Sequence, residues 1–310
     1  MESHRTEGLV VRVTGKEIWV DTGKETAPCL PRGRFRRGGK GLQIVAGDRV
    51  EVSFDDPRSG AAIESVLPRR TWLSRHAGGR DPVPRVILAN IDVLFLVETL
   101  RAPAVSHRFI DRVLVAAGTG HIDVRICLNK IDLVPELNDI KSIMSVYESL
   151  GYAVMPMSAK TGEGVSQVSE LLRGGIYAFV GRSGVGKSSL LNRIAPKLDL
   201  EVRDVARKTG GGRHTTTYSQ LFAIEGGFVA DTPGMQTFGF PGDDEESLSR
   251  CFLEFAPLDA ECRFHPCTHS HEPECAVKKA VENGEIARTR YESYIDMLRE
   301  IEDRGRNRYS

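Results

Sequence analysis

A glycine-rich stretch near the middle of the chain restricts the possible folds more than any other feature. GRSGVGKS occupies residues 181–188, after the strand-like run IYAFVG and before the helix-like run KSSLLNRIA. It fits the pattern G-x-x-x-x-G-K-[ST], which forms a phosphate-binding loop when a strand leads into it and a helix leads out. Both neighbours are present. The sequence therefore predicts an α/β fold with a phosphate-binding loop at the carboxyl end of a strand.

The residue types of this loop suit phosphate binding. Gly184 and Gly186 permit backbone conformations that turn amide groups toward phosphate oxygens, and Lys187 adds a positive charge at the β- and γ-phosphates. Ser188 offers a hydroxyl group to Mg²⁺. We take the whole loop as nucleotide-binding, with Lys187 also a catalytic candidate: Gly181, Arg182, Ser183, Gly184, Val185, Gly186, Lys187, Ser188 and Ser189.

Two earlier stretches predict which base is bound. NKID comprises Asn129, Lys130, Ile131 and Asp132, and SAKTG begins with Ser158, Ala159 and Lys160. The Asp132 carboxylate can accept from the ring N–H and amine of guanine, donors that adenine does not pair in this way. Asn129 can donate to the base N7 and tie its loop to the phosphate loop, the Lys130 stem can cover a base face, and the Ala159 amide can meet the guanine carbonyl. Together they favour a guanine-nucleotide site. The alternative, a P-loop ATPase or kinase, would prefer ATP.

Two later stretches predict the remaining nucleotide contacts. In DTPG, Asp231 would hold Mg²⁺ through water and the Gly234 amide would sense the γ-phosphate. In GGRHTTTY, Thr216 is the first choice to close on Mg²⁺ and Thr215 the second. A threonine-rich loop without that role is the alternative.

The residue that orients the attacking water is harder to choose. Many GTPases place a glutamine directly after DxxG, but this chain has Met235 there. His214 is the nearest substitute, and a loop histidine without a catalytic part is the alternative. We therefore expect weak intrinsic hydrolysis that a partner accelerates.

The motifs stand in an unusual order: base-reading first, then phosphate-binding, then Mg²⁺ and γ-phosphate. A GTPase chain usually begins with the phosphate loop. Because the carboxyl ends of parallel strands meet at one edge of a sheet, joining the old termini and cutting elsewhere would preserve the site. The order therefore predicts a circularly permuted GTPase domain.

The flanking segments differ in pattern. Residues 1–68 alternate apolar and polar residues in short bursts, which predicts antiparallel strands in a small barrel or sandwich. LPRR and HAGGRDPVP are expected to form a linker, and VILANIDVLFLVET (residues 86–99) a buried parallel strand. The basic stretch RGRFRRGGK, with Phe35 available for stacking, predicts RNA contacts, and a solvated basic loop is the alternative.

A cluster of cysteines and histidines lies near the C-terminus. CRFHPCTHSHEPEC contains Cys262, Cys267 and Cys275, with His269 as a fourth ligand and His265 and His271 as competing imidazoles. Three thiolates and one imidazole complete a tetrahedral Zn²⁺ shell, which leaves no open position and makes the site structural. A chance cluster or a redox role is the alternative. A helix-like stretch, LSRCFLEFA, precedes the cluster, and a charged helix follows it within residues 276–304.

Composition adds limits rather than a function. Lys plus Arg equals Asp plus Glu at 42 each, so net charge predicts no particular partner. The N-terminus lacks a secretory pattern and no apolar run reaches the roughly 18 residues of a membrane span. We expect a cytoplasmic protein without membrane contact.

The permuted order together with GRSGVGKSSL, GGGRHTTTY, DTPGMQTFGF and HEPECAVKKAVENGEI resembles the ribosome small subunit-dependent GTPase A (RsgA) family over nearly the whole chain. The resemblance implies an N-terminal OB-fold barrel (residues 1–68), a permuted P-loop GTPase (69–240) and a small helical zinc domain (241–310). It also implies His269 as the fourth ligand. The implied activity is GTP hydrolysis during late maturation of the small (30S) ribosomal subunit, with contacts to its 16S rRNA. We expect a monomer. The competing hypothesis is a zinc-containing RNA-binding module that only senses the nucleotide.

Overall fold

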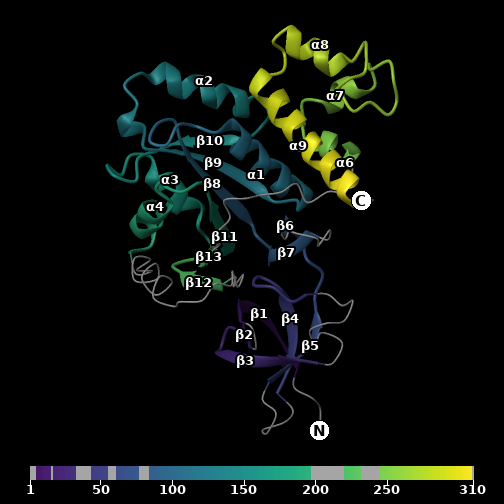
Figure 1. Ribbon diagram of the computed structural model, residues 1–310. Coiled ribbons are helices and arrows are strands. Elements are labelled where there is room, and N and C mark those ends of the chain that lie inside the picture. The colour runs from purple at the N-terminus through teal and green to yellow at the C-terminus, as the bar shows by residue number, and fades with distance from the viewer. Residues whose placement is uncertain are drawn as a thin grey trace.

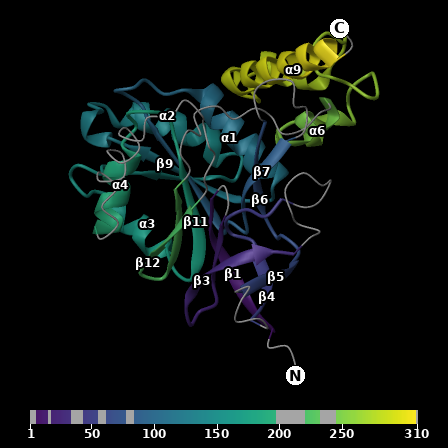
Figure 2. The same cartoon turned by 60° about the horizontal axis from the view of Figure 1, so that its bottom comes forward.

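The protein was analysed as a computed structural model, which describes residues 5–14, 17–32, 43–54, 61–76, 84–196, 220–231 and 245–308. Three regions follow one another along the chain (Figure 1). A small β-barrel lies at one end, a helix-covered sheet in the middle, and a group of C-terminal helices beside the sheet at the far end from the barrel. Figure 2 shows the same arrangement from a second direction.

Five short strands close the N-terminal barrel. Its apolar positions alternate along each strand, so that Val10, Val20, Val50, Val52 and Ile63 are fully buried inside it. Pairing runs β1–β2–β3–β5–β4 and returns from β4 to β1. The prediction of a barrel or sandwich is thereby narrowed to a closed, OB-like barrel. The strands are β1 (Arg5–Val13), β2 (Ile18–Asp21), β3 (Thr26–Pro31), β4 (Arg49–Ser53) and β5 (Ala61–Val66).

The segment expected to be a linker contains a hairpin. β6 (Trp72–His76) pairs with β7 (Pro84–Ala89) in an antiparallel two-stranded sheet. The run predicted as one strand over residues 86–99 is therefore two strands, and β8 (Val93–Thr99) joins the main sheet. The chain turns between them at Asn90, whose φ is 54°. Asn90 stabilises the turn because its side chain accepts from the Arg70 amide and donates to the Gly47 carbonyl.

The central sheet places five parallel strands side by side. Its order is β10–β9–β8–β11–β13, and β12 closes the edge antiparallel to β13. Among the described residues, one register pair, Arg12 with Gln220, joins β12 to the barrel strand β1. The strands are β9 (Asp123–Asn129), β10 (Ala153–Pro156), β11 (Gly175–Val180), β12 (Gln220–Ile224) and β13 (Gly227–Asp231). The strand carrying the phosphate loop, β11, is thus central although it comes late in the chain, as the predicted permutation requires.

Helices cover both faces of this sheet. On one face, α1 (His107–Thr119) and α2 (Leu137–Glu148) pack over side chains such as Leu94 and Ile126. On the other, α3 (Val165–Leu171) and α4 (Lys187–Ile194) pack over the alternate positions, among them Phe95 and Phe179. The side-chain period of two along each strand produces this division.

Within residues 245–308, the C-terminal region contains four helices. They are α6 (Glu245–Arg250), α7 (Ala256–Asp259), α8 (Ala276–Glu282) and α9 (Arg288–Arg308). The stretch expected as one helix over residues 276–304 breaks at Gly284, whose φ of +80° ends α8. Their common core includes Phe252, Phe255 and Tyr294, and it also takes in Val115 of α1. Across the part of the chain that the structure describes, no helix combines the length and apolarity that a membrane span needs.

Candidate functional site

The phosphate loop lies between β11 and α4, as its sequence pattern predicts. Gly184 and Gly186 have φ angles of +80° and +92°, a region that favours glycine. At Gly181 a Cβ atom would lie 2.3 Å from the carbonyl oxygen of Val97 on the neighbouring strand β8. The glycines therefore serve two purposes: two set the curvature of the loop and one permits its close approach to the sheet. Ser183, Ser188 and Ser189 are exposed on the loop and the first turn of α4.

The Lys187 side chain lies across the loop. Its ammonium group donates to the carbonyl oxygens of Gly181 and Arg182, at 2.5 Å and 3.0 Å. Burial lowers the pKa of Lys187, while the nearby Glu98 acts in the opposite direction. The Lys187 ammonium group is therefore partly buried at the loop, where it can reach phosphate oxygens. This position suits its predicted role in phosphate binding.

Asn129 connects the two base-reading loops to the phosphate loop. It stands at the end of β9 and is 1% exposed. Its Nδ2 donates to the Val185 carbonyl at 2.8 Å, and its Oδ1 accepts from the Ala159 amide at 2.9 Å. A Cβ at Gly186 would lie 2.4 Å from the same Nδ2. The expected tie between loops is therefore present, and the Ala159 amide, predicted to meet guanine, donates to Asn129 in this structure.

Lys130 and Asp132 extend this arrangement outward. Lys130 has a left-handed backbone, with φ 63°, and its ammonium group donates at 2.6 Å both to Gly184 and to Ala102. Asp132 is exposed in the short 3₁₀ turn Ile131–Leu133, and the buried Ser158 hydroxyl donates to its Oδ1 at 2.6 Å. Ser158 thus fixes the direction of the carboxylate at the edge where the base-reading loops meet. Lys160 is exposed beside them.

Arg193 is a site residue that sequence reasoning missed. It lies in the last turn of α4, and its guanidinium donates to the carbonyls of Ala159, Lys160 and Thr161 at 3.2–3.3 Å. The contacts hold the SAKTG loop against the phosphate-loop helix. No pattern within α4 distinguishes this arginine from a surface residue, because its partners are more than 30 positions away in the chain.

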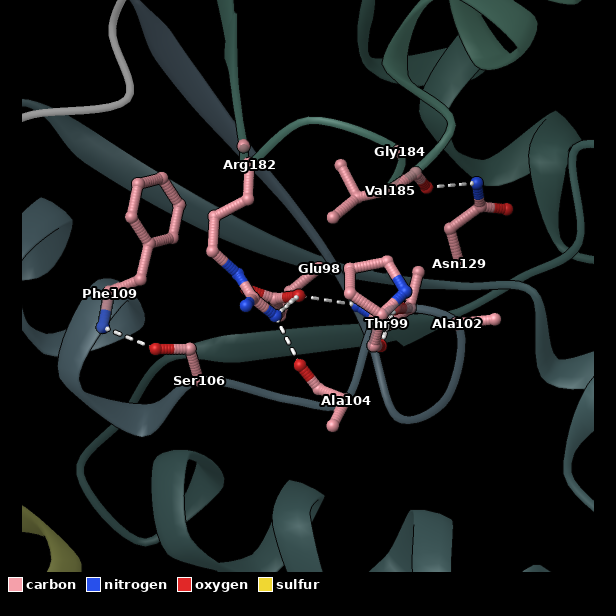
Figure 3. Close-up of polar contacts among 12 residues, drawn as sticks. Glu98, Thr99, Ala102, Ala104, Ser106, Phe109, Asn129, Arg182, Gly184 and Val185 are labelled. Carbon is pink, nitrogen blue, oxygen red and sulfur yellow. Dashed lines mark hydrogen bonds and ion pairs between the residues drawn. The ribbon is translucent and has the colours of Figure 1, made fainter.

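Glu98 is a second missed residue. It lies near the end of β8, its side chain is fully buried, and it forms a two-bond ion pair with Arg182 of the phosphate loop (Figure 3). The sequence assigned Arg182 to the loop through its position alone. The observed pair shows that its guanidinium turns down toward the sheet, where it also donates to the Ala104 carbonyl.

The four predicted metal ligands come together in the C-terminal core. Cys262, Cys267, His269 and Cys275 are all buried, and their ligand atoms lie within 4.8 Å of one another. The Nδ1 atom of His269 lies 3.6 Å from the Cys262 sulfur and 3.5 Å from the Cys275 sulfur, and those two sulfurs are 3.9 Å apart. In a tetrahedral zinc site the Zn–S bonds are near 2.3 Å and the Zn–N bond near 2.0–2.1 Å. These bond lengths place the nitrogen about 3.6 Å from each sulfur and the sulfurs about 3.8 Å from one another. The donor set therefore fits a closed Zn²⁺ shell.

The surrounding residues hold this cluster in place. Glu272 accepts from the Thr268 amide and hydroxyl and from the Ser270 amide. Burial alone would raise the pKa of Glu272, but these hydrogen bonds outweigh it and lower the pKa to about 2. Tyr291 donates to the His269 carbonyl at 2.8 Å. The competing imidazoles, His265 and His271, are exposed outside the cluster.

The other cysteines stand apart from this cluster. Cys29 and Cys127 are buried in the barrel and sheet cores, and burial raises the pKa of both thiols. Cys251 is half-buried. All three lie outside the group of candidate zinc ligands.

Several predicted residues cannot be compared. His214, Thr215, Thr216 and Gly234 lie outside the described residues, as does most of the basic stretch after Arg32. Asp231 is described at the backbone, as the last residue of β13, the strand next to β11. That position puts it at the carboxyl edge of the sheet, beside the strand that leads into the phosphate loop.

Comparisons with known proteins agree on one family. The profile of the RsgA GTPase family matches residues 66–241. The chain is 42% identical to a small ribosomal subunit biogenesis GTPase RsgA of Thermotoga maritima, covering 96% of this chain and 97% of that protein. It is 36% identical to the protein of that name from Bacteroides fragilis, with 96% and 97% covered.

Two solved structures share the fold. The crystal structure of YjeQ from Thermotoga maritima matches with a TM-score of 0.74 and 37% identity, covering 96% of this chain and 99% of that one. The structure of YloQ, described as a circularly permuted GTPase, matches with a TM-score of 0.72 and 29% identity, covering 97% and 96%.

Proposed function

This chain belongs to the RsgA family of GTPases, and we propose that it hydrolyses GTP to GDP and phosphate while bound to the small ribosomal subunit, as a factor in the maturation of that subunit. The observation that carries this proposal is the Asn129 side chain, which bonds both the phosphate loop and the SAKTG loop. These two hydrogen bonds bring motifs that are far apart in the sequence into a single site.

The nucleotide roles follow from this geometry. We assign guanine recognition to Asp132, with Asn129, Lys130 and the Ala159 loop supporting it, and phosphate binding to Lys187 and the loop amides. With GTP, Mg²⁺ would be held by Ser188 and, through water, by Asp231, and would neutralise developing charge on the phosphates. Thr216 or Thr215 would complete its shell. His214 remains the proposed water-orienting residue.

We divide the remaining tasks between the flanking regions. The OB-like barrel, proposed as residues 1–68, would contact rRNA, and its basic stretch at residues 32–40 supports this because clustered cations bind phosphates. Residues 241–310 would form a structural zinc domain held by Cys262, Cys267, His269 and Cys275. Because Zn²⁺ binding supplies folding free energy, the metal would stabilise the C-terminal helices without taking part in hydrolysis. Small ribosomal subunits mature in the cytoplasm, which is therefore the proposed location.

The proposal is tested by multiple-turnover hydrolysis at fixed salt. GTP should be hydrolysed slowly by the protein alone and faster with purified small subunits, whereas large subunits should leave the rate unchanged. ATP is the matched nucleotide control and should not be turned over. If GTP binds but no multiple turnover occurs with small subunits, the protein is a nucleotide-sensing RNA-binding module instead.

A further inference from the structure

A carboxylate is buried beneath the phosphate loop. Glu98 belongs to β8, which pairs in parallel with the loop's own strand β11, Leu96 standing opposite Val180. The Glu98 side chain is 0% exposed. An isolated charge at such a position is strongly unfavourable, and at this position it would also repel phosphate.

Arg182 compensates this charge. Its Nε donates to Glu98 Oε2 at 3.0 Å and its Nη2 to Oε1 at 2.8 Å, the two-bond geometry that guanidinium and carboxylate form best. Figure 3 shows the Arg182 side chain leaving the loop and ending between Glu98 and Ala104. The Thr99 amide also donates to Oε1, at 2.9 Å. The arginine thus occupies a loop position without offering its charge to the outer side of the loop.

The field of Glu98 reaches the phosphate-binding cation. Burial lowers the pKa of Lys187, and Glu98 is the group that opposes this by favouring the charged ammonium. Any charge left uncompensated at Glu98 would therefore act on the same space as Lys187. Because the position of Arg182 in the loop pattern accepts any residue type, the pattern gave no sign of this role.

We propose that Arg182 is a positioning residue that neutralises Glu98 under the phosphate loop and thereby sets how strongly the site favours GTP over GDP. This rests on the proposed guanine-nucleotide function. The loop binds polyphosphates, and GTP carries one more phosphate group than GDP. An uncompensated carboxylate under the loop therefore weakens the binding of GTP more than the binding of GDP. When Arg182 neutralises it, the preference for GTP over GDP is set by the loop amides and Lys187.

The test measures GTP and GDP affinities by titration at fixed Mg²⁺ and salt. Arg182→Met should lower the GTP-to-GDP affinity ratio roughly tenfold, the scale of one extra phosphate charge meeting an uncompensated carboxylate at moderate distance. Glu98→Gln alone leaves an uncompensated cation and should shift the ratio the other way. The double variant Glu98→Gln/Arg182→Met should return the ratio to within about twofold of the parent.

An ion pair between the stretch after β5 and the barrel provides a matched control. Arg69 forms the same kind of two-bond pair with Asp48, whose side chain is also 0% exposed, at 2.7 Å and 3.0 Å. Arg69→Met should lower the unfolding temperature but leave the GTP-to-GDP ratio unchanged.

Three outcomes separate the alternatives. An unchanged ratio in Arg182→Met and Glu98→Gln overturns the proposal. A double variant that keeps the ratio of Arg182→Met also overturns it, because the lost contact with Ala104 would then be the cause. A parent protein that binds neither nucleotide rejects the proposed function itself, which is a different result from an unchanged ratio.

Discussion

At the scale of single residues, the proposed base selection depends on an exposed carboxylate, Asp132, oriented by the buried Ser158 hydroxyl. Asp132→Asn replaces an acceptor that faces the donors of guanine, and should weaken GTP binding by about 1–3 kcal/mol. Affinity for xanthosine triphosphate should rise, because xanthine has a carbonyl where guanine has an amine. Titration with both nucleotides measures this. Asp139→Asn, an exposed carboxylate on α2 paired with Arg101, is the matched control. Equal GTP affinity in Asp132→Asn and the parent would show that another residue reads the base.

Residues that belong to motifs were predictable from sequence, whereas residues that support them were not. Lys187, Asn129 and Asp132 stand in short patterns with a stated chemistry, and the structure brings their loops together. Glu98 and Arg193 stand in no pattern. Glu98 lies 84 positions before Arg182, so only the parallel neighbours β8 and β11 bring them into contact. An isolated glutamate in an apolar run gives no sign of its partner.

At the scale of elements, the approach between barrel and hairpin was invisible in the sequence. The apolar residues in 86–99 predict a buried segment. The same pattern results from one buried strand and from two successive strands that pack against different neighbours, so the sequence does not distinguish them. The structure divides the run because the Ala89 amide donates to the Ala46 carbonyl of a barrel turn at 3.0 Å. Gly47 of that turn lies so close that an added Cβ would be 1.9 Å from the Ala89 carbonyl oxygen.

Gly47→Ala tests whether this contact stabilises the fold. The φ angle of Gly47 is +88°, and an L-residue there costs about 1–2 kcal/mol. Overlap with Ala89 adds about 1–3 kcal/mol. Gly23→Ala is the matched control, because Gly23 has a φ of +80° but no atom within 4 Å of the added Cβ. Denaturant unfolding should show a larger loss for Gly47→Ala. Equal losses would mean that the barrel turn moves away at no cost.

The packing of the C-terminal elements is proposed to depend on Zn²⁺. The three cysteines belong to the same buried core as Phe252, Phe255 and Tyr294, so loss of a bound Zn²⁺ would remove the bonds that connect separate segments of this core. Chelation should expose residues 245–308 to limited proteolysis while GTP affinity stays unchanged. Cys262→Ser should reproduce this effect, and Cys251→Ser, outside the cluster, should not. An unaltered digest of protein shown to be metal-free would reject the structural role.

At the scale of the whole molecule, the permuted motif order predicted the strand arrangement, but nothing in it predicted where the third region attaches. That region packs on α1, the helix that follows the loop bonded by Arg182 and Lys130. Two of the contacts are the ion pairs Arg108–Asp296 and Arg112–Glu300 between α1 and α9. From sequence alone, charged residues of both signs on a helix predict a face exposed to solvent. The ion pairs between α1 and α9 appear only in the folded structure.

A buried triad also crosses this interface. Arg290 of α9 is 1% exposed and donates to Asp111 of α1 at 2.7 Å and to both carboxylate oxygens of Glu254, at 2.7 Å and 3.0 Å. Its guanidinium lies over the Phe252 ring, 4.6 Å from the centroid. Burial alone would lower the pKa of Arg290, but the two carboxylates outweigh it and raise it. Burial also raises the pKa of Asp111, against the effect of Arg290. The triad joins helix α1 of the GTPase region to the C-terminal helices.

Arg290→Met should detach the C-terminal region from the GTPase. Removing one partner of a buried ion pair costs about 3–5 kcal/mol, because the remaining carboxylates stay buried without compensation. Arg250→Met is the control, since Arg250 and Glu246 form an exposed pair, 75% and 66% accessible, in which little stability resides. Hydrogen exchange should rise in α9 and on the facing side of α1 in Arg290→Met alone. GTP affinity should hold, because none of the three triad residues belongs to a nucleotide loop. If the triple variant Asp111→Asn/Glu254→Gln/Arg290→Met is no more protected than Arg290→Met, packing over Phe252 and not charge joins the two regions.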